Sequence, residues 1–289
     1  MLEVKSVKKS YGDDVVLKDV SLSVESGEIV GFVGENGAGK TTLIRAILGL
    51  HNIDSGEIIF NGVKNFQHNQ MMMKQIGYLL DTELFEYLSA YQSLKLMGIY
   101  EGERYSKQQI EGMLARVLLN ADNKPIKSYS YGMKQRLRLA MAMIRPRKLL
   151  ILDEPLLGLD IKTIQEFKHY LREIANSGVA ILLSSHQLSE IEDIIDRYMI
   201  LDSGVIQKEV LGKQTAYKVS LGLDAADVQK FLSELGLSDS DNIRVDEKNM
   251  YVISQDVLNV VLKAAYNQEL NVKFQQINIV NQLFLDKGE

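Results

Sequence analysis

The residues with the clearest chemical meaning form a glycine-rich segment near the amino terminus. In order they are Gly34, Glu35, Asn36, Gly37, Ala38, Gly39, Lys40 and Thr41, with Thr42 directly after them. Their spacing matches G-x-x-x-x-G-K-[ST], in which the backbone amides of a glycine loop surround the phosphates of a nucleotide. In such a loop Lys40 can reach the β- and γ-phosphates, and the Thr41 hydroxyl can bind Mg²⁺. The segment therefore predicts a nucleotide-binding site.

The residues on both sides of this segment favour the same interpretation. Residues 28–34 (EIVGFVG) form an almost continuous apolar run, which is typical of a strand buried on both faces. Residues 41–50 (TTLIRAILGL) have apolar side chains at helical spacing. A loop between such a strand and helix directs the amino terminus of the helix at the phosphates. This context disfavours the alternative, a glycine turn with an incidental lysine.

Two acidic residues, Asp153 and Glu154, follow the apolar strand that residues 148–152 (KLLIL) predict. A strand that ends at the phosphate site can hold Asp153 against Mg²⁺, while Glu154 orients or deprotonates the attacking water. Taken alone, the pattern is equally typical of an aspartate that caps the following helix. The surrounding motifs decide between these interpretations.

The segment just upstream of the two carboxylates supplies that context. Residues 129–136 read YSYGMKQR, which by itself indicates only a capped amphipathic helix. Together with the glycine loop and the carboxylates, it resembles the signature motif of the ATP-binding cassette (ABC) ATPases. The resemblance covers residues 1 to about 210 and implies ATP and Mg²⁺ as ligands. It also implies that Ser130 and Gly132 bind the ATP of a second, identical or homologous chain in a head-to-tail dimer.

Three more positions match the family. Asp160 ends the segment LGLD, which resembles the D-loop, and His186 follows a predicted strand where the family has its switch histidine. The resemblance implies that His186 bonds the γ-phosphate and polarises the attacking water, and that Tyr11 stacks on adenine. Without the resemblance, His186 would be a structural histidine and Tyr11 an exposed hairpin residue.

The sequence departs from the family pattern in two places. Asp81 follows IGYLL where members usually have glutamine or glutamate, and it can still approach Mg²⁺ or the attacking water through a bridging water. Tyr131 and Met133 replace a glycine and a glutamine of the usual signature. Similar variants occur in the subgroup of bacitracin and lantibiotic immunity or peptide-export ATPases, so the resemblance points to that subgroup.

The pattern of elements predicts an α/β fold, a P-loop NTPase cassette with a helical subdomain and a small C-terminal α+β domain. We expect the ATPase domain to span residues 1–212, with the helical subdomain at about 81–140. Strands at 148–152 and 179–184 around a helix predict a parallel sheet with a crossover helix. Residues 213–289 have the order β-α-β-β-α-β, which predicts a ferredoxin-like accessory domain.

The composition excludes several other classes of protein. The 33 basic and 38 acidic residues give a formal charge of −5, which argues against a dedicated nucleic-acid binder. The absence of cysteine excludes a disulfide scaffold or an iron-sulfur site and fits a reducing cytosolic compartment. No stretch approaches the roughly 18 consecutive apolar residues of a membrane helix, so we expect membrane association through a partner.

These features predict an ATP-hydrolysing subunit on the cytoplasmic face of a bacterial membrane. It would drive export or clearance of a peptide-like or hydrophobic substrate through a separate transmembrane permease, docked beside Asp81 and the helical subdomain. The alternative is a cytosolic ABC ATPase of the translation or DNA-repair type, which usually has two cassettes or a long coiled coil. This chain has neither. A P-loop kinase would lack the signature helix and the D-loop.

Overall fold

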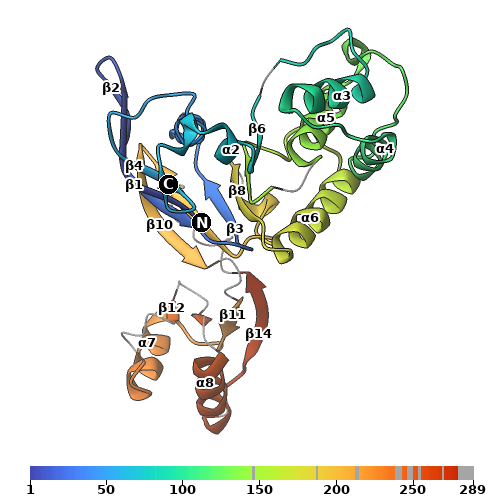
Figure 1. The fold of residues 1–289 in the computed structure, drawn as a ribbon. Helices are drawn as coiled ribbons and strands as arrows, with labels where there is room; N and C mark the ends of the chain where they lie inside the picture. The colour runs from blue at the N-terminus through green and yellow to red at the C-terminus, as the bar shows by residue number, and fades with distance from the viewer. Residues whose placement is uncertain are drawn as a thin grey trace. The chain divides into compact units, whose positions relative to one another are not determined.

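The computed structural model describes residues 1–81, 83–144, 147–186, 188–211, 215–237, 243–245, 250–252, 255–268 and 270–278. The chain divides into two compact units, Met1–Gly212 and Lys213–Glu289 (Figure 1). Each unit has its own buried apolar core.

The first unit is built on a mixed sheet with ten described strands. In sheet order they are β5 (Val63–Lys64), β4 (Ser55–Phe60), β1 (Leu2–Tyr11), β2 (Asp14–Val24), β10 (Val205–Leu211), β9 (Arg197–Asp202), β3 (Ile29–Val33), β8 (Ala180–Ser185), β7 (Leu149–Leu152) and β6 (Ile76–Leu79). From β9 to β6 each strand is parallel to the next, and β1, β2, β4 and β5 pair antiparallel with one another. The strand β10 between these two groups is antiparallel to β9 and parallel to β2. Parallel strands end at the same edge of a sheet, so this part can bring several loops together.

The three central parallel strands are buried along their whole length. Every residue of β3, β7 and β8 is buried, as the unbroken apolar runs in the sequence predict. The strands β7 and β8 are parallel and are joined by α6 (Ile161–Asn176), which confirms the predicted crossover. The predicted α/β fold is confirmed.

The helices of the first unit have two arrangements. Helix α1 (Lys40–Ile47) follows β3 directly, and the short α2 (Gln70–Met73) precedes β6. The remaining helices α3 (Ala90–Glu101), α4 (Lys107–Arg116) and α5 (Tyr131–Met143) pack on one another to one side of the sheet (Figure 1). Short 3-10 turns lie at Phe66–His68, Ile126–Ser128 and Leu188–Glu190. The fold thus includes a helical subdomain between β6 and β7.

The starts of these helices are explained by their local sequence. Helix α3 begins with a capping box of Ser89 and Gln92, and α4 begins with a second one of Ser106 and Gln109. In each box the serine hydroxyl accepts a bond from a helix amide, and the serine backbone amide donates to the side-chain oxygen of the glutamine. None of the helices in the described residues is long and apolar enough to cross a membrane.

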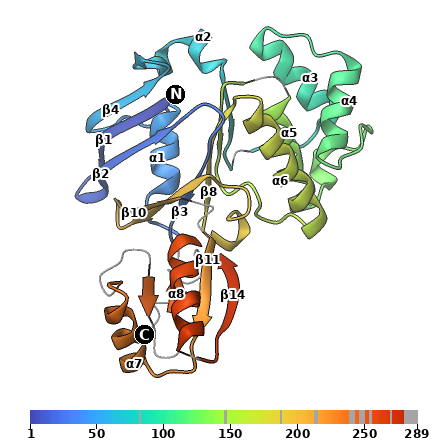
Figure 2. The same cartoon turned by 90° about the horizontal axis from the view of Figure 1, so that it is seen from below.

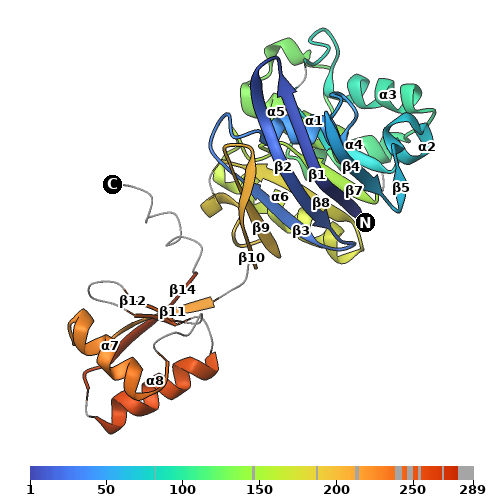
Figure 3. The same ribbon diagram turned by 90° about the vertical axis from the view of Figure 1, so that its left-hand side faces the viewer.

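The second unit has the chain order β-α-β-β-α-β. Its elements are β11 (Thr215–Ser220), α7 (Ala225–Glu234), β12 (Ile243–Val245), β13 (Met250–Val252), α8 (Gln255–Asn267) and β14 (Lys273–Asn278). The strands form an antiparallel sheet in the order β12-β13-β11-β14, with α7 and α8 on the same side (Figures 2 and 3). Val219, Phe231, Met250 and Val261 belong to its core. This arrangement matches the small α+β domain that the sequence predicts.

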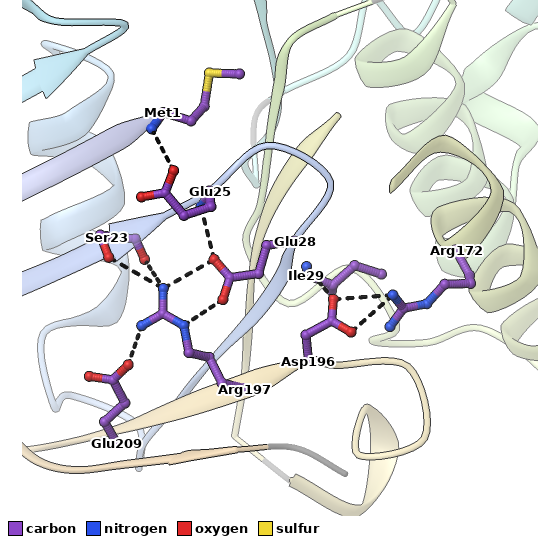
Figure 4. A network of polar contacts seen from close by, with 9 residues as sticks. All are labelled: Met1, Ser23, Glu25, Glu28, Ile29, Arg172, Asp196, Arg197 and Glu209. Carbon is purple, nitrogen blue, oxygen red and sulfur yellow. Dashed lines mark hydrogen bonds and ion pairs between the residues drawn. The ribbon is translucent and has the colours of Figure 1, made fainter. Parts of the chain in front are cut away.

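A network of ion pairs holds the strand ends at the sheet edge away from the glycine loop (Figure 4). The largely buried guanidinium of Arg197 donates through Nε to Glu28 at 2.5 Å and also pairs with Glu209. The bonds to Glu28 raise the pKa of Arg197 above its ordinary value, so the arginine stays charged. A second pair joins Arg172 to Asp196 at 3.1 Å. These contacts tie the start of β9 to the start of β3, to β10 and to α6.

Candidate active site

The glycine loop lies between β3 and α1, and its glycines are required for steric reasons. Gly39 has a φ of 109°, and a Cβ there would lie 2.9 Å from Leu17. At Gly34 a Cβ would lie 2.4 Å from the carbonyl oxygen of Leu201. Helix α1 starts at Lys40, and no described side chain caps its amino terminus. Its first amides are therefore available to an anion.

Lys40 is held inside the loop. Its side chain is 6% exposed, and Nζ donates to the carbonyl oxygens of Gly34 at 2.6 Å and Glu35 at 3.1 Å. The same Nζ lies 3.6 Å from Oε1 of Glu154. A buried ammonium needs such partners, and the oxygens of a triphosphate can replace them.

Thr41 and Asp153 meet across the edge of the sheet. The Thr41 hydroxyl donates to Oδ2 of Asp153 at 2.8 Å, and the Ser184 hydroxyl donates to Oδ1 at 2.6 Å. Hydroxyl and carboxylate oxygens are suitable Mg²⁺ ligands, and Mg²⁺ in nucleotide sites takes few protein ligands besides phosphates and water. The donor set fits Mg²⁺. The described residues contain no cluster of three or more histidine, aspartate or glutamate side chains that could hold a metal alone.

Glu154 has the geometry of a group prepared to accept a proton. Its Oε2 lies 2.9 Å from Nδ1 of His186, while its Oε1 is buried and has no hydrogen-bond partner among the described residues. The Lys40 ammonium, 3.6 Å away, offsets the charge of this oxygen without a hydrogen bond, so its hydrogen-bonding capacity is left for a water or ligand. This oxygen can accept a hydrogen bond from an attacking water. His186 holds the other oxygen and thereby orients the carboxylate.

The signature residues Ser130 and Gly132 lie at the start of α5. The Ser130 side chain caps the helix by accepting a bond from the amide of Met133 at 3.3 Å. Gly132 packs so closely on Gly158 that a Cβ would lie 2.7 Å from the Gly158 carbonyl oxygen. The ring of Tyr131 also packs on Gly158, where a Cβ would lie 2.4 Å from the ring.

Asp160 caps α6 in the same region. Its carboxylate accepts bonds from the amide of Thr163 at 3.0 Å and from the Thr163 hydroxyl at 2.8 Å, and it pairs with Arg136 of α5. These bonds, with the nearby arginine, lower the pKa of Asp160 to about 2. The structure therefore joins the signature helix to the segment that resembles the D-loop.

Two predicted site residues stand apart from this cluster. The Tyr11 ring is 44% exposed, makes an edge contact with His51 at a centroid distance of 5.7 Å, and has Lys9 5.0 Å from its centroid. Asp81 is 87% exposed and pairs with Arg138 at 3.0 Å. In the part of the chain that the structure describes, Asp153 accepts bonds from Thr41 and Ser184, whereas Asp81 pairs with Arg138 and is not joined to them.

Sequence reasoning missed two polar residues that organise the site. Ser184, at the end of β8, accepts a bond from the amide of Glu154 at 2.9 Å while it donates to Asp153. Gln135, on α5, donates to the backbone of Glu154. A serine at the end of a buried strand was a usable signal for the first, but a glutamine inside an amphipathic helix is indistinguishable from a surface residue.

An apolar pocket of about 420 Å³ lies between β6 and the helical subdomain. Its lining includes Tyr78, Leu84, Met97, Tyr100 and Met141, together with the Arg147–Glu101 ion pair at 2.9 Å. Tyr78 and Tyr100 are exposed. Exposed apolar side chains around a hollow are typical of an interaction surface.

Comparison with known proteins finds similarity to the ATP-binding proteins of ABC transporters. The profile of the ABC transporter family matches residues 17–157. The lantibiotic transport ATP-binding protein SrtF of Streptococcus pyogenes is 37% identical over 218 residues, which cover 74% of this chain and 93% of that protein. The bacitracin transport ATP-binding protein BcrA of Bacillus licheniformis is 35% identical over 217 residues, 73% of this chain and 69% of that protein.

Two solved structures show the same architecture. An ATP-binding subunit of an ABC transporter is 29% identical with a TM-score of 0.67, covering 91% of this chain and 99% of that chain. A dimeric bacterial ABC transporter cassette, 23% identical, also has a TM-score of 0.67 and covers 74% of this chain and 99% of its own. The chain therefore belongs to the ABC transporter family as an ATP-hydrolysing, ATP-binding subunit that uses ATP with Mg²⁺.

Proposed function

We propose that this chain drives the export or clearance of a peptide-like or hydrophobic compound through a separate membrane permease. The observation that carries the proposal is the presence of two features in one unit. The first is the hydrolytic cluster, by which we mean Lys40, Thr41, Asp153, Glu154 and His186, and the second is the apolar pocket beside it. The substrate class is supported by the names of the relatives, which describe lantibiotic and bacitracin transport. The chain would act at the cytoplasmic face of a bacterial membrane as a peripheral subunit.

The proposed mechanism assigns one task to each residue of the cluster. The glycine loop, its amides, Thr42 and Lys40 hold the phosphates, and Thr41 with Asp153 would hold Mg²⁺. Bound Mg²⁺ neutralises the charge of phosphate oxygens. Glu154 orients and deprotonates the attacking water through Oε1, which has no hydrogen-bond partner among the described residues, while His186 fixes the carboxylate through Oε2.

A second chain would complete the site. We propose that Ser130 and Gly132 face the ATP held by the partner, with Asp160 beside them and Tyr11 stacked on adenine. Exposed apolar side chains surround the signature helix start on the same unit, namely Tyr131, Leu157 and Ile161. Burial of such side chains is a favourable contribution to association.

The permease would dock on the pocket between β6 and the helical subdomain. Its exposed tyrosines and half-buried methionines suit an amphipathic helix laid into a groove. Asp81 lies at the edge of this region, two residues beyond β6. We propose that Asp81 serves coupling to the permease, with a water-mediated approach to Mg²⁺ as its second possible role.

The experiment that tests this function is charge reversal at Asp81 in the assembled transporter. We expect Asp81→Lys to reduce substrate transport about tenfold and to leave ATP affinity within about twofold of the wild type, because the new charge repels Arg138 and disturbs the docking edge. Asp122→Lys, on the loop between α4 and α5, is a matched charge reversal on an exposed aspartate. Collapse of ATP affinity would make Asp81 a metal ligand instead. Unchanged transport would show that Asp81 does not serve coupling to the permease.

The division of labour between the two units is also a proposal. We propose that residues 1–212 are the ATPase domain and that residues 213–289 are an accessory domain that supports the dimer. All the site residues named above belong to the first unit, and the second unit has a core of its own.

A chain shortened to residues 1–212 tests that division. We expect it to bind ATP within about threefold of the full chain and to dimerise less in the presence of ATP, because only the support is lost. Titration with a labelled ATP analogue and sizing with ATP measure the two quantities. Circular dichroism establishes that the shortened chain is folded. A folded chain without ATP affinity would show that the second unit helps to build the site.

A further inference from the structure

A buried glutamine of α5 reaches the backbone of the hydrolytic cluster. The side-chain amide of Gln135 donates to the carbonyl oxygens of Glu154 at 3.2 Å and Pro155 at 3.4 Å. The Gln135 side chain is 4% exposed, so water is a poor substitute for it. The turn that presents the Glu154 carboxylate thus depends on a donor from the helical subdomain.

The backbone at Glu154 needs such support. Its φ is 46°, in the left-handed region that a residue with a side chain rarely adopts. A strained residue keeps this conformation only when its surroundings hold it. Its amide donates to Ser184 at 2.9 Å, and its carbonyl accepts from the amide of Leu157 at 3.3 Å as well as from Gln135.

Arg138, one helical turn after Gln135, orients the glutamine. Its Nη1 donates to Oε1 of Gln135 at 3.5 Å, so the amide nitrogen of Gln135 is turned toward the two carbonyls. Its Nη2 lies 3.0 Å from Oδ1 of Asp81. The Arg138 side chain is 12% exposed, whereas Asp81 is 87% exposed. An ion pair with one end in water stabilises the fold little, but it fixes the direction of the guanidinium.

We propose that Gln135 and Arg138 are positioning residues for ATP hydrolysis, which connect Asp81 at the edge of the apolar pocket to the backbone of Glu154. The inference rests on the proposed role of Glu154 as the base. A displacement of Asp81 changes the direction of Arg138, then of the Gln135 amide, and finally of the turn that aims the carboxylate. Neither Gln135 nor Arg138 belongs to the glycine loop. We therefore expect this path of contacts, from Asp81 through Arg138 and Gln135 to Glu154, to affect turnover and not ATP affinity.

The first test replaces the glutamine in the full chain. We expect Gln135→Met, which keeps the volume without the donor, and Gln135→Glu, which keeps the shape without the donor, each to lower kcat about tenfold with ATP affinity within about twofold. Gln109→Ala removes the capping glutamine of α4 and is the matched control, with kcat within about twofold of the wild type. Wild-type kcat in both folded Gln135 variants would overturn the proposal.

A second arm separates this proposal from the assignment of the base. In a Glu154→Gln background, Gln135→Met should cause no further loss of turnover, because the group that it positions is gone. A further tenfold loss would show that Gln135 acts elsewhere and would overturn the positioning role. Glu154→Gln hydrolysing at the wild-type rate would instead defeat the proposed base.

The third arm tests the contact between Asp81 and Arg138, in the absence of a permease. Asp81→Asn and Arg138→Met should each lower kcat several-fold at unchanged ATP affinity, and Asp81→Glu should restore most of the activity by keeping the ion pair. Losses that simply multiply in the Asp81→Asn, Gln135→Met double variant would show that the two residues act independently. That result would overturn the connection.

Discussion

A Lys40→Ala variant is expected to bind ATP at least about 100-fold more weakly than the wild type. The ammonium group is the cation inside the glycine loop, where it is shielded from water and held by the carbonyl oxygens of Gly34 and Glu35. Charge-assisted bonds to phosphate are strong in such surroundings, and each factor of ten in affinity corresponds to about 1.4 kcal/mol. Equilibrium titration with a labelled ATP analogue measures the loss.

The variant also leaves Glu154 without its nearby cation, so folding must be checked by circular dichroism. Lys64→Ala is a suitable control, since Lys64 lies on β5 in an exposed ion pair with Glu57. We expect the control to bind ATP as the wild type does. Undiminished affinity in a folded Lys40→Ala chain would contradict the assignment of the phosphate site.

The second large effect is expected from Glu154→Gln, which should retain ATP affinity and lose turnover by about 100-fold or more. An amide nearly matches the carboxylate in size but cannot accept the proton of the attacking water. Because hydrolysis is blocked after binding, the ATP-bound dimer should accumulate. Steady-state hydrolysis and sizing with and without ATP measure the two consequences. His186→Ala should give a milder loss, because the carboxylate would remain but lose its orienting contact.

Glu57→Gln provides the matched control, because it makes the same chemical change at an exposed glutamate. The control should hydrolyse ATP at the wild-type rate. If Glu154→Gln were as active as the wild type, the proton acceptor would have to be another group. The proposed roles of Glu154 and of its positioning residues would then both need revision.

Much of the fold follows from local sequence. The loop from Gly34 to Thr41 is continuous in the chain, so spacing alone indicates its function. The buried strands β3, β7 and β8 are almost unbroken apolar runs, and such a run by itself predicts a strand buried on both faces. The strands β4 (SGEIIF) and β6 (IGYL) were not predicted, because glycine and polar residues interrupt their apolar residues and leave neither an unbroken apolar run nor a clear alternation.

The order of the elements in the second unit could also be predicted from the sequence, since each helix and strand has its own hydrophobic periodicity. The roles of Ser130, Gly132, Tyr11 and Asp81 stay predictions, since they concern bound ligands and a second chain. Sequence alone placed Asp153 and Glu154 beside the phosphate site only because the glycine loop and the signature-like segment occur in the same chain.

The contacts that make the site work are decided by tertiary structure. Thr41 and Asp153 are 112 residues apart and meet because parallel strands end at one edge of the sheet. The Glu154 backbone adopts a strained φ that no local pattern encodes, and Gln135 supports it from a helix 19 residues upstream. Side-chain types and their spacing determine which chemistry is available, whereas the packing of distant elements determines which atoms come within bonding distance.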